Sequence, residues 1–154
     1  MHANLLPTPV EEMPEWIASI KAEYIVSRMT AGESPAEAKA AADTSFEQQF
    51  PNGRQRKLHL VFNVVADDDV VGYLWIGPQT NGDASKWWVW DVEIYEPFQR
   101  RGYGRDAMLL AEHEARLAGA IELGLNVFGY NVGARKLYES LGYESTSIRM
   151  AKHL

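Results

Sequence analysis

A glycine-rich junction between a strand-like and a helix-like segment constrains the fold of this chain more than any other feature. The segment before it, WWVWDVEIY at residues 87–95, is rich in aromatic and β-branched residues and predicts a strand. The junction itself is QRRGYG, residues 99–104. The segment after it has its apolar residues at helical spacing until Gly119, which ends the helix. IELGLNV then predicts a second strand. This order, from Trp87 to Val127, predicts a parallel strand pair joined by a right-handed crossover.

The remaining segments predict antiparallel strands and three further helices. Residues 11–29 have helical spacing, and Ser34 and Glu37 form the capping box of a second helix. LHLVFNVVAD and VVGYLWIG flank three aspartates and predict a hairpin, NVGARKLYESL predicts a helix closed by Gly142, and YESTSIRMAK predicts a final strand. We therefore expect one domain over residues 1–154, of the α/β (α+β) class, with a mixed, mostly antiparallel twisted sheet flanked by helices.

Composition and charge narrow the classes of function. The chain has no cysteine, which excludes a disulfide framework, a thiolate zinc site and a cysteine nucleophile. The histidines show no ligand spacing, so we predict no metal site. The formal net charge of −6 argues against nucleic acid and anionic membranes as partners. No run of residues approaches membrane-spanning length, and the N-terminus lacks the features of a signal peptide, so the cytoplasm is the default location.

The junction has the properties of an anion-binding site. A helix N-terminus presents unpaired N–H groups and a partial positive charge. Gly102 and Gly104 allow an anion to approach the backbone closely. Three arginines add cationic donors around the same point, namely Arg100, Arg101 and Arg105. The same residues also fit a strand-to-helix turn with surface arginines, and the two glycines alone do not decide between these readings.

Two better-known phosphate-binding loops do not fit the junction. A Walker loop needs Lys followed by Ser or Thr after its last glycine, whereas Arg105 follows Gly104. The letters GYGRDA match the spacing of a dinucleotide-binding loop, but residues 96–101 separate them from the preceding strand. Glu122 also stands at the wrong end of the next strand for a ribose contact. A nucleotide-dependent oxidoreductase is therefore disfavoured.

Two longer segments in the second half of the chain, WDVEIYEPFQRRGYGRDAM and NVFGYNVGARKLYESLGYE, have a recognisable pattern. Together they resemble the GNAT superfamily of acyl-CoA-dependent N-acetyltransferases over residues 87–143. The family's loop, Gln/Arg-x-x-Gly-x-Gly/Ala, falls on Gln99, Gly102 and Gly104. The resemblance implies a GNAT-type fold and acetyl-CoA as the acyl donor.

The resemblance also implies how coenzyme A binds. The parallel strands at the centre of the sheet would splay apart near Ile94 and Val127, so that the pantetheine arm pairs with exposed backbone. The amides of the junction would hold the pyrophosphate. The implied coenzyme A contacts are Ile94, Tyr95, Gln99, Arg100, Arg101, Gly102, Tyr103, Gly104, Arg105, Asn131, Ala134 and Tyr138.

The second segment carries a further motif on the last predicted helix, at Asn131, Ala134 and Tyr138. Asn131 and Tyr138 are nearly two helical turns apart and share one face. Asn131 also suits a helix N-cap, and Tyr138 also suits a core aromatic residue. The resemblance implies that Tyr138 is the general acid that protonates the departing thiolate.

Direct attack on a thioester requires a neutral amine, so a general base is useful. A lysine-like amine with a pKa of about 10.4 is neutral about once in 2500 molecules at pH 7, a penalty of about 4.6 kcal/mol. Glu93 is the predicted base, with Asp91 on the same strand face as the alternative. Glu93 also fits the competing interpretation, in which it is a surface carboxylate without catalytic function. Related families often bulge this strand, which changes the side chains that face the substrate.

The acceptor site is predicted less sharply. Trp75 and Trp90, together with Asp91, are the predicted acceptor contacts, although most tryptophans of these strands are expected in the core. The acidic N-terminal third favours a cationic amine.

We predict an enzyme that moves an acetyl group from acetyl-CoA to a primary amine of a small molecule or peptide, without a covalent enzyme intermediate. The alternative is a non-catalytic acyl-CoA sensor or interaction module. A homodimer is compatible with the resemblance, because dimers are frequent among similar proteins.

Overall fold

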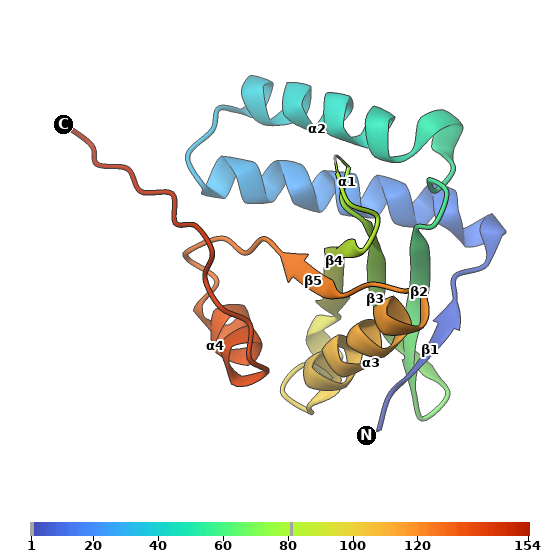
Figure 1. Cartoon of the computed structure of the whole chain (residues 1–154). Coiled ribbons are helices and arrows are strands. Elements are labelled where there is room, and N and C mark those ends of the chain that lie inside the picture. Colours follow the sequence, from blue (N-terminus) through green and yellow to red (C-terminus); the bar gives the residue numbers. More distant parts are fainter. Residues whose placement is uncertain (1, 81) are drawn as a thin grey trace.

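A five-stranded sheet lies at the centre of the protein, in a computed structural model that describes residues 2–80 and 82–154 (Figure 1). The strands lie side by side in sequence order and are β1 (Asn4–Pro7), β2 (Leu60–Ala66), β3 (Asp69–Pro78), β4 (Lys86–Ile94) and β5 (Glu122–Leu125). The helices are α1 (Met13–Thr30), α2 (Pro35–Gln49), α3 (Tyr103–Leu117) and α4 (Val132–Ser140), with short 3-10 helices at Val10–Glu12, Pro51–Gly53 and Glu96–Phe98. Within the described residues, no helix is long and apolar enough to cross a membrane.

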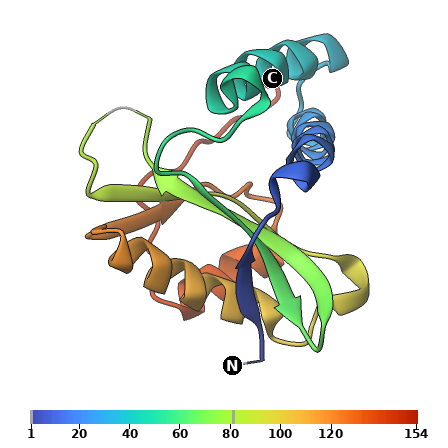
Figure 2. The ribbon, with the colours of Figure 1, turned by 90° about the vertical axis from the view of Figure 1, so that its right-hand side faces the viewer.

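The sheet is mixed, as its sequence predicts. Strands β1 to β4 pair antiparallel, whereas β4 and β5 pair in parallel and are joined through α3. Figure 2 shows α1 and α2 over one face of the sheet and α3 and α4 over the other. The predicted α/β class with a mixed sheet flanked by helices is therefore confirmed.

Each face of the sheet buries its own apolar core. On the α3 side, Leu74 and Trp87 pack with Met108 of the helix. On the α1 side, Trp16 of the helix packs edge-on against Trp75, with ring centroids 6.0 Å apart. Burial of such large side chains is the dominant stabilising term of folding.

Local sequence rules explain where several elements begin and end. Ser34 Oγ accepts a hydrogen bond from the Glu37 N–H at 3.2 Å, and the Glu37 carboxylate accepts one from the Ser34 N–H at 2.9 Å. This is the predicted capping box at the start of α2. Asp67 and Asp68 have positive φ values of 50° and 69°, so two residues close the predicted hairpin between β2 and β3.

The first strand, β1, was not predicted. Its four residues pair with β2, so that Asn4 lies opposite Val65. The Asp106 carboxylate of α3 accepts hydrogen bonds from the N–H groups of His2 at 2.7 Å and Ala3 at 3.1 Å. These partners lie 61 and more than 100 residues away in the chain, so no local pattern could indicate them.

The predicted C-terminal strand is wrong. Residues 144–154 form neither helix nor strand in the described structure, and their side chains are exposed. As a result β5 is the last strand of the sheet, and the parallel pair lies at its edge instead of at its centre. The alternation in YESTSIRMAK suits a strand, but a strand also needs a neighbour to accept its hydrogen bonds, and this segment has none in its own sheet.

Candidate active site

Strand β4 contains a bulge at Trp90. Trp75 of β3 lies opposite Asp91, but the next residue of β3, Ile76, lies opposite Val89. Trp90 is therefore an extra residue in β4, which matches the bulge that the family resemblance implied.

The bulge brings Trp90 and the two predicted base residues to the α1 face of the sheet. Trp90 stacks on Trp75, with ring centroids 5.4 Å apart. Asp91 Oδ2 accepts a hydrogen bond of 3.1 Å from the Tyr73 hydroxyl, and Glu93 lies opposite Tyr73 in the strand register. The two carboxylates therefore lie on either side of one buried hydroxyl group.

Both carboxylates hold a proton more tightly than a free carboxylic acid does. Burial raises the pKa of Asp91 to about 6, and the negative charges of Glu93 and of Glu23 on α1 act in the same direction. Burial also raises the pKa of Glu93, with a smaller contribution from Glu23. The hydrogen bond from Tyr73 lowers both pKa values. A carboxylate with a pKa near neutrality is suited to general-base work.

The parallel strands are paired only along the first half of β4. The paired residues are Lys86 to Val89 of β4 and Glu122 to Leu125 of β5. Beyond Val89, the described part of β5 offers no partner to β4. The predicted splay thus begins at the bulge.

The main chain after the bulge is only partly free. The Tyr95 N–H donates to the Val71 carbonyl at 2.9 Å, and the Tyr95 carbonyl accepts from the Phe98 N–H at 2.8 Å. Gln99 Nε2 donates to the Ile94 carbonyl at 2.8 Å. Because successive amides of a strand point to opposite sides, the Ile94 N–H points toward the side of β5. Of the two predicted backbone contacts, Ile94 therefore offers a free donor, whereas the Tyr95 main chain is engaged.

The junction forms an open, amide-lined start to α3. Gly102 precedes the helix with a φ of 88°, and no side chain caps the helix within the described residues. The first helical hydrogen bond runs from the Asp106 N–H to the Gly102 carbonyl, so the amides of Tyr103, Gly104 and Arg105 precede the helical ladder. A Cβ built on Gly102 meets no heavy atom within 4 Å. Free amides, positive helix dipole and open space fit a pyrophosphate.

The arginines of the junction are exposed around this helix start. Arg100 has a positive φ of 63°, which turns the chain into the junction. The Arg101 guanidinium lies over the Phe98 ring at 5.9 Å, and Arg105 Nη1 donates to Ser140 Oγ of α4 at 3.4 Å. All three side chains are exposed, so they add positive charge without a buried partner to hold them.

Helix α4 presents the second predicted motif. Asn131 Oδ1 accepts from the Ala134 N–H at 3.2 Å, so Asn131 is the N-cap of α4. Tyr138 is half-buried and lies edge-on to Tyr143, with centroids 6.1 Å apart. Burial raises the pKa of Tyr138, and the negative charge of Asp91 raises it further, so its hydroxyl keeps its proton at neutral pH.

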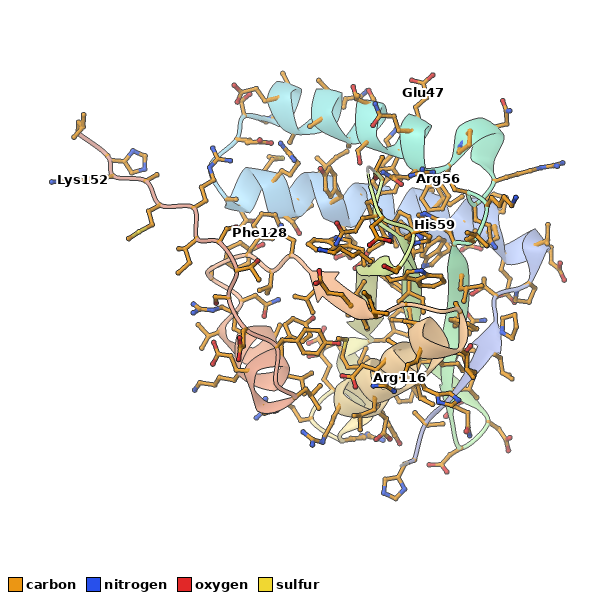
Figure 3. All side chains as sticks on the ribbon, viewed as in Figure 1. Glu47, Arg56, His59, Arg116, Phe128 and Lys152 are labelled. Carbon is orange, nitrogen blue, oxygen red and sulfur yellow. The ribbon has the colours of Figure 1, made fainter. Side chains whose placement is uncertain are left out.

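The aromatic residues of the α1 face are supported by a buried histidine. His59 is 2% exposed, and its Nδ1 accepts a hydrogen bond of 3.0 Å from Trp75 Nε1. Burial lowers the pKa of His59 to about 4, so the ring is neutral and can accept this bond. Trp75 is itself 4% exposed, so of the two predicted acceptor tryptophans only Trp90 keeps appreciable surface. In Figure 3, His59 lies in the middle of the molecule beneath α1 and α2.

Sequence reasoning missed three residues of this region, namely Glu23, His59 and Tyr73. Each acts through a partner at least 16 residues away in the chain. Alternation along β3 could have placed Tyr73 and Trp75 on one face, but no local signal links His59 or Glu23 to that face.

The described residues contain no group of three or more metal-ligating side chains close enough to hold a metal ion.

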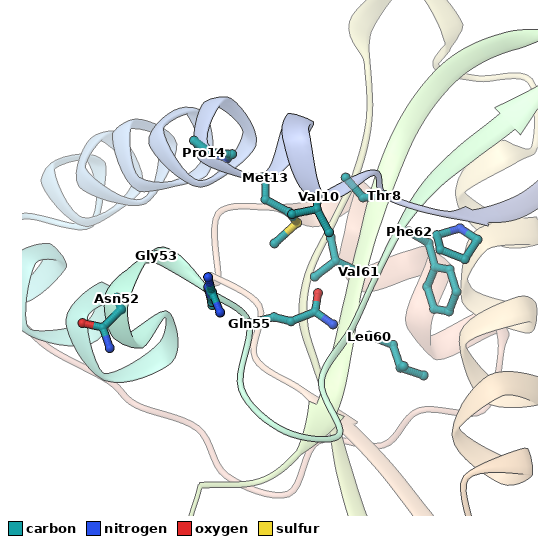
Figure 4. A pocket seen from close by; sticks show the side chains of 12 residues that line it. Thr8, Val10, Met13, Pro14, Asn52, Gly53, Gln55, Leu60, Val61 and Phe62 are labelled. Atoms are coloured by element: carbon teal, nitrogen blue, oxygen red, sulfur yellow. The ribbon is translucent and has the colours of Figure 1, made fainter.

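Hollows also lie outside the junction, among the residues that the structure describes. A small one of about 170 Å³ is lined by Gln79, Thr80, Trp88 and Trp90. A larger one of about 740 Å³ lies between the start of α1, the loop around Asn52 and strand β2 (Figure 4). Met13 and Val61 lie on its apolar wall, and Gln55 reaches in from the loop. The small hollow adjoins the bulge in β4, whereas the larger one lies toward strands β1 and β2 at the opposite edge of the sheet.

The chain belongs to the acetyltransferase (GNAT) family, whose model matches residues 22–143. It is 30% identical to YycN of Bacillus subtilis, an uncharacterized N-acetyltransferase, over the whole of both chains. It is also 33% identical to a ribosomal protein bS18-alanine N-acetyltransferase of Salmonella typhimurium, over 63% of each chain.

Solved structures agree with this family. The crystal structure of YycN superposes with a TM-score of 0.89 at 29% identity and covers 99% of this chain and 98% of its own. The aminoglycoside N-acetyltransferase AAC(6')-Iy in complex with CoA superposes with a TM-score of 0.59 at 14% identity, over 99% of this chain and 95% of its own. At that identity the likeness shows the fold alone.

Proposed function

We propose that this chain transfers an acetyl group from acetyl-CoA to a primary amine by direct attack in a ternary complex. The observation that carries the proposal is the uncapped, glycine-started N-terminus of α3, which follows the unpaired end of β4 and the two half-buried carboxylates. When bound, acetyl-CoA supplies the activated acetyl thioester. The chain's own residues bind it, position the amine and move two protons.

The amides of Tyr103, Gly104 and Arg105 bind the pyrophosphate, with the exposed arginines as cationic donors. The Ile94 N–H is the free strand donor for the pantetheine arm, and Asn131 and Ala134 at the start of α4 are further coenzyme A contacts. The side chain of Gln99 holds the Ile94 carbonyl and thereby fixes the end of β4.

The two carboxylates share the work of the general base. Asp91 is the stronger candidate, because its pKa of about 6 lies closer to neutral pH than that of an ordinary carboxylic acid. Glu93 is the second candidate, because burial also raises its pKa and it lies opposite Tyr73 in the strand register. Either group, directly or through a water molecule, takes a proton from the amine and offsets part of the roughly 4.6 kcal/mol that a neutral amine costs at pH 7.

Tyr138 provides the second proton. Its raised pKa keeps the phenol protonated, so its hydroxyl can donate to the sulfur atom that leaves. The negative charge of Asp91 contributes to that shift, so the two groups interact electrostatically.

The acceptor is a cationic amine. Glu23, Asp91 and Glu93 give the α1 face a negative potential, which attracts an ammonium group before it is deprotonated. The exposed part of Trp90 offers an aromatic face beside them. The acceptor named for the Salmonella relative is an alanine of a ribosomal protein, and AAC(6')-Iy is named for aminoglycosides; both are amines.

Release of free thiol from acetyl-CoA across a panel of amines tests the proposal. We expect turnover with at least one cationic amine, and losses of tenfold or more in kcat for Tyr138→Phe and for Asp91→Asn. Tyr130→Phe, an exposed tyrosine on the loop before α4, and Glu47→Gln on α2 are matched controls that should keep full activity. Tight binding of coenzyme A in calorimetry without turnover on any amine would overturn the proposal that the chain is an enzyme. That result would favour the non-catalytic acyl-CoA sensor.

A further inference from the structure

Tyr73 of β3 places a hydroxyl group inside an aromatic cluster. The residue is 4% exposed, and its ring packs edge-on against Trp16 of α1, with ring centroids 5.6 Å apart. A phenylalanine would make the same ring contacts without burying a polar group, and a buried polar group costs free energy unless it is hydrogen-bonded. Packing alone therefore does not explain this hydroxyl.

The Tyr73 hydroxyl lies beside the two carboxylates of β4. In the antiparallel register Glu93 lies directly opposite Tyr73, and Asp91 lies two residues away on the same face of the strand. The hydroxyl donates to Asp91 Oδ2 at 3.1 Å. A hydroxyl has one proton to donate, so it holds one carboxylate at a time. In this structure the carboxylate that it holds is Asp91.

The charged groups around the Tyr73 hydroxyl are negative. Glu23 of α1 acts on both Asp91 and Glu93 from the helix packed over this face. Among the described residues, no cationic side chain contributes to the pKa shift of either carboxylate. Burial and the charges of Asp91 and Glu93 raise the pKa of Tyr73, so its hydroxyl keeps its proton and acts as a donor.

The other titratable groups nearby do not change charge near neutral pH. Tyr95 packs against Tyr73, with ring centroids 6.3 Å apart, and burial raises its pKa. Tyr138 of α4 also has a raised pKa, to which the charge of Asp91 contributes. His59, which holds the neighbouring Trp75, has a pKa of about 4 and is neutral. Titration near pH 6 in this region therefore belongs to the carboxylates.

We infer that Tyr73 is a positioning residue that makes Asp91, and not Glu93, the general base. This inference rests on the proposed function, because it assigns roles within the same site. The Tyr73 hydroxyl holds Asp91 by Oδ2 and leaves Oδ1 to take a proton from the ammonium group, directly or through a water molecule. The N–H bond breaks, an O–H bond forms on Asp91, and Tyr73 keeps its own proton. Glu93 stays charged and attracts the cationic acceptor.

Carbon-13 NMR titration of the side-chain carboxyl groups tests the role of Tyr73 without any turnover. Tyr73→Phe removes the hydroxyl and keeps the ring against Trp16. We expect Asp91 to titrate at about pH 6 in the parent, and about half a unit or more higher in Tyr73→Phe, because the hydrogen bond that favours its charged form is lost. The signal of Asp91 is identified by its absence from Asp91→Asn.

Tyr24→Phe is the matched control for this titration. It removes a hydroxyl of α1 that accepts a hydrogen bond from Arg28 at 2.8 Å, and it should leave the pKa of Asp91 unchanged. If the pKa of Asp91 is the same in Tyr73→Phe as in the parent, or if Tyr24→Phe raises it equally, Tyr73 does not position the base.

The pH dependence of kcat/KM on an amine that is turned over provides the second test. Its acid limb should move up in Tyr73→Phe by as much as the pKa of Asp91 does, whereas a purely structural role would lower kcat/KM without moving the limb. Glu93→Gln should keep the limb and move it down, because a negative neighbour of Asp91 is lost. A limb that disappears in Glu93→Gln would make Glu93 the base and contradict the inference. A parent that acetylates no amine contradicts the proposed function, while the NMR titration still decides the role of Tyr73.

Discussion

Replacing Asp91 with asparagine should stabilise the fold at neutral pH while it slows acetyl transfer. Burial is the main cause that raises the pKa of Asp91 from 3.8 to about 6, a difference that corresponds to about 3 kcal/mol. Because the folded state holds this proton more tightly than the unfolded chain, the cost of the charged group is absent below about pH 3.8. This destabilising cost grows as the pH rises from about 3.8 toward 6, and it is fully present above about pH 6. Asparagine carries no charge, and its carbonyl can still accept the hydrogen bond from the Tyr73 hydroxyl.

Urea unfolding followed by circular dichroism, at pH 8 and at pH 4, measures the effect. We expect the free energy of unfolding of Asp91→Asn to exceed that of the parent by about 1–3 kcal/mol at pH 8 and to match it at pH 4. His59 also titrates toward pH 4, but it is common to both proteins and cancels in the difference. Asp69→Asn, on the exposed hairpin, should change nothing at either pH. An Asp91→Asn variant that is less stable at pH 8, or equally shifted at both pH values, would refute the reasoning.

Three further predictions concern single contacts. Gly104→Val should weaken coenzyme A binding tenfold or more, about 1.4 kcal/mol, because the valine side chain enters the space beside Leu137 and Ile94. Unchanged affinity in calorimetry would count against the placement of the pyrophosphate. His59→Phe keeps a ring but leaves Trp75 Nε1 without its acceptor, and should lower the unfolding free energy in urea by about 1–3 kcal/mol; no change would mean that the bond is replaced. Ser34→Ala removes the cap of α2 and should cost about 1 kcal/mol in the same assay, whereas an unaltered midpoint would show that the cap is dispensable.

Much of the candidate site could be predicted because its parts are local. The glycines and arginines of the junction lie within a few residues of the helix that they start, so their spacing alone indicates the open N-terminus of α3. The same holds for Asn131, whose cap bond reaches only to Ala134. The roles of Glu93, Asp91 and Tyr138 in catalysis are still predictions, since they depend on a bound substrate.

The sequence by itself determined the elements whose hydrogen bonds and spacing are short-range: the capping box at Ser34, the two-residue hairpin, and the order of strand, junction and helix. Only the tertiary structure decided which side chains meet. It placed the bulge at Trp90, set Tyr73 between two carboxylates, and left residues 144–154 without a strand partner in their own chain. The physical reason is that a cap or a turn is stabilised by neighbours in the chain, whereas strand register, burial and a shifted pKa depend on residues brought together from distant positions.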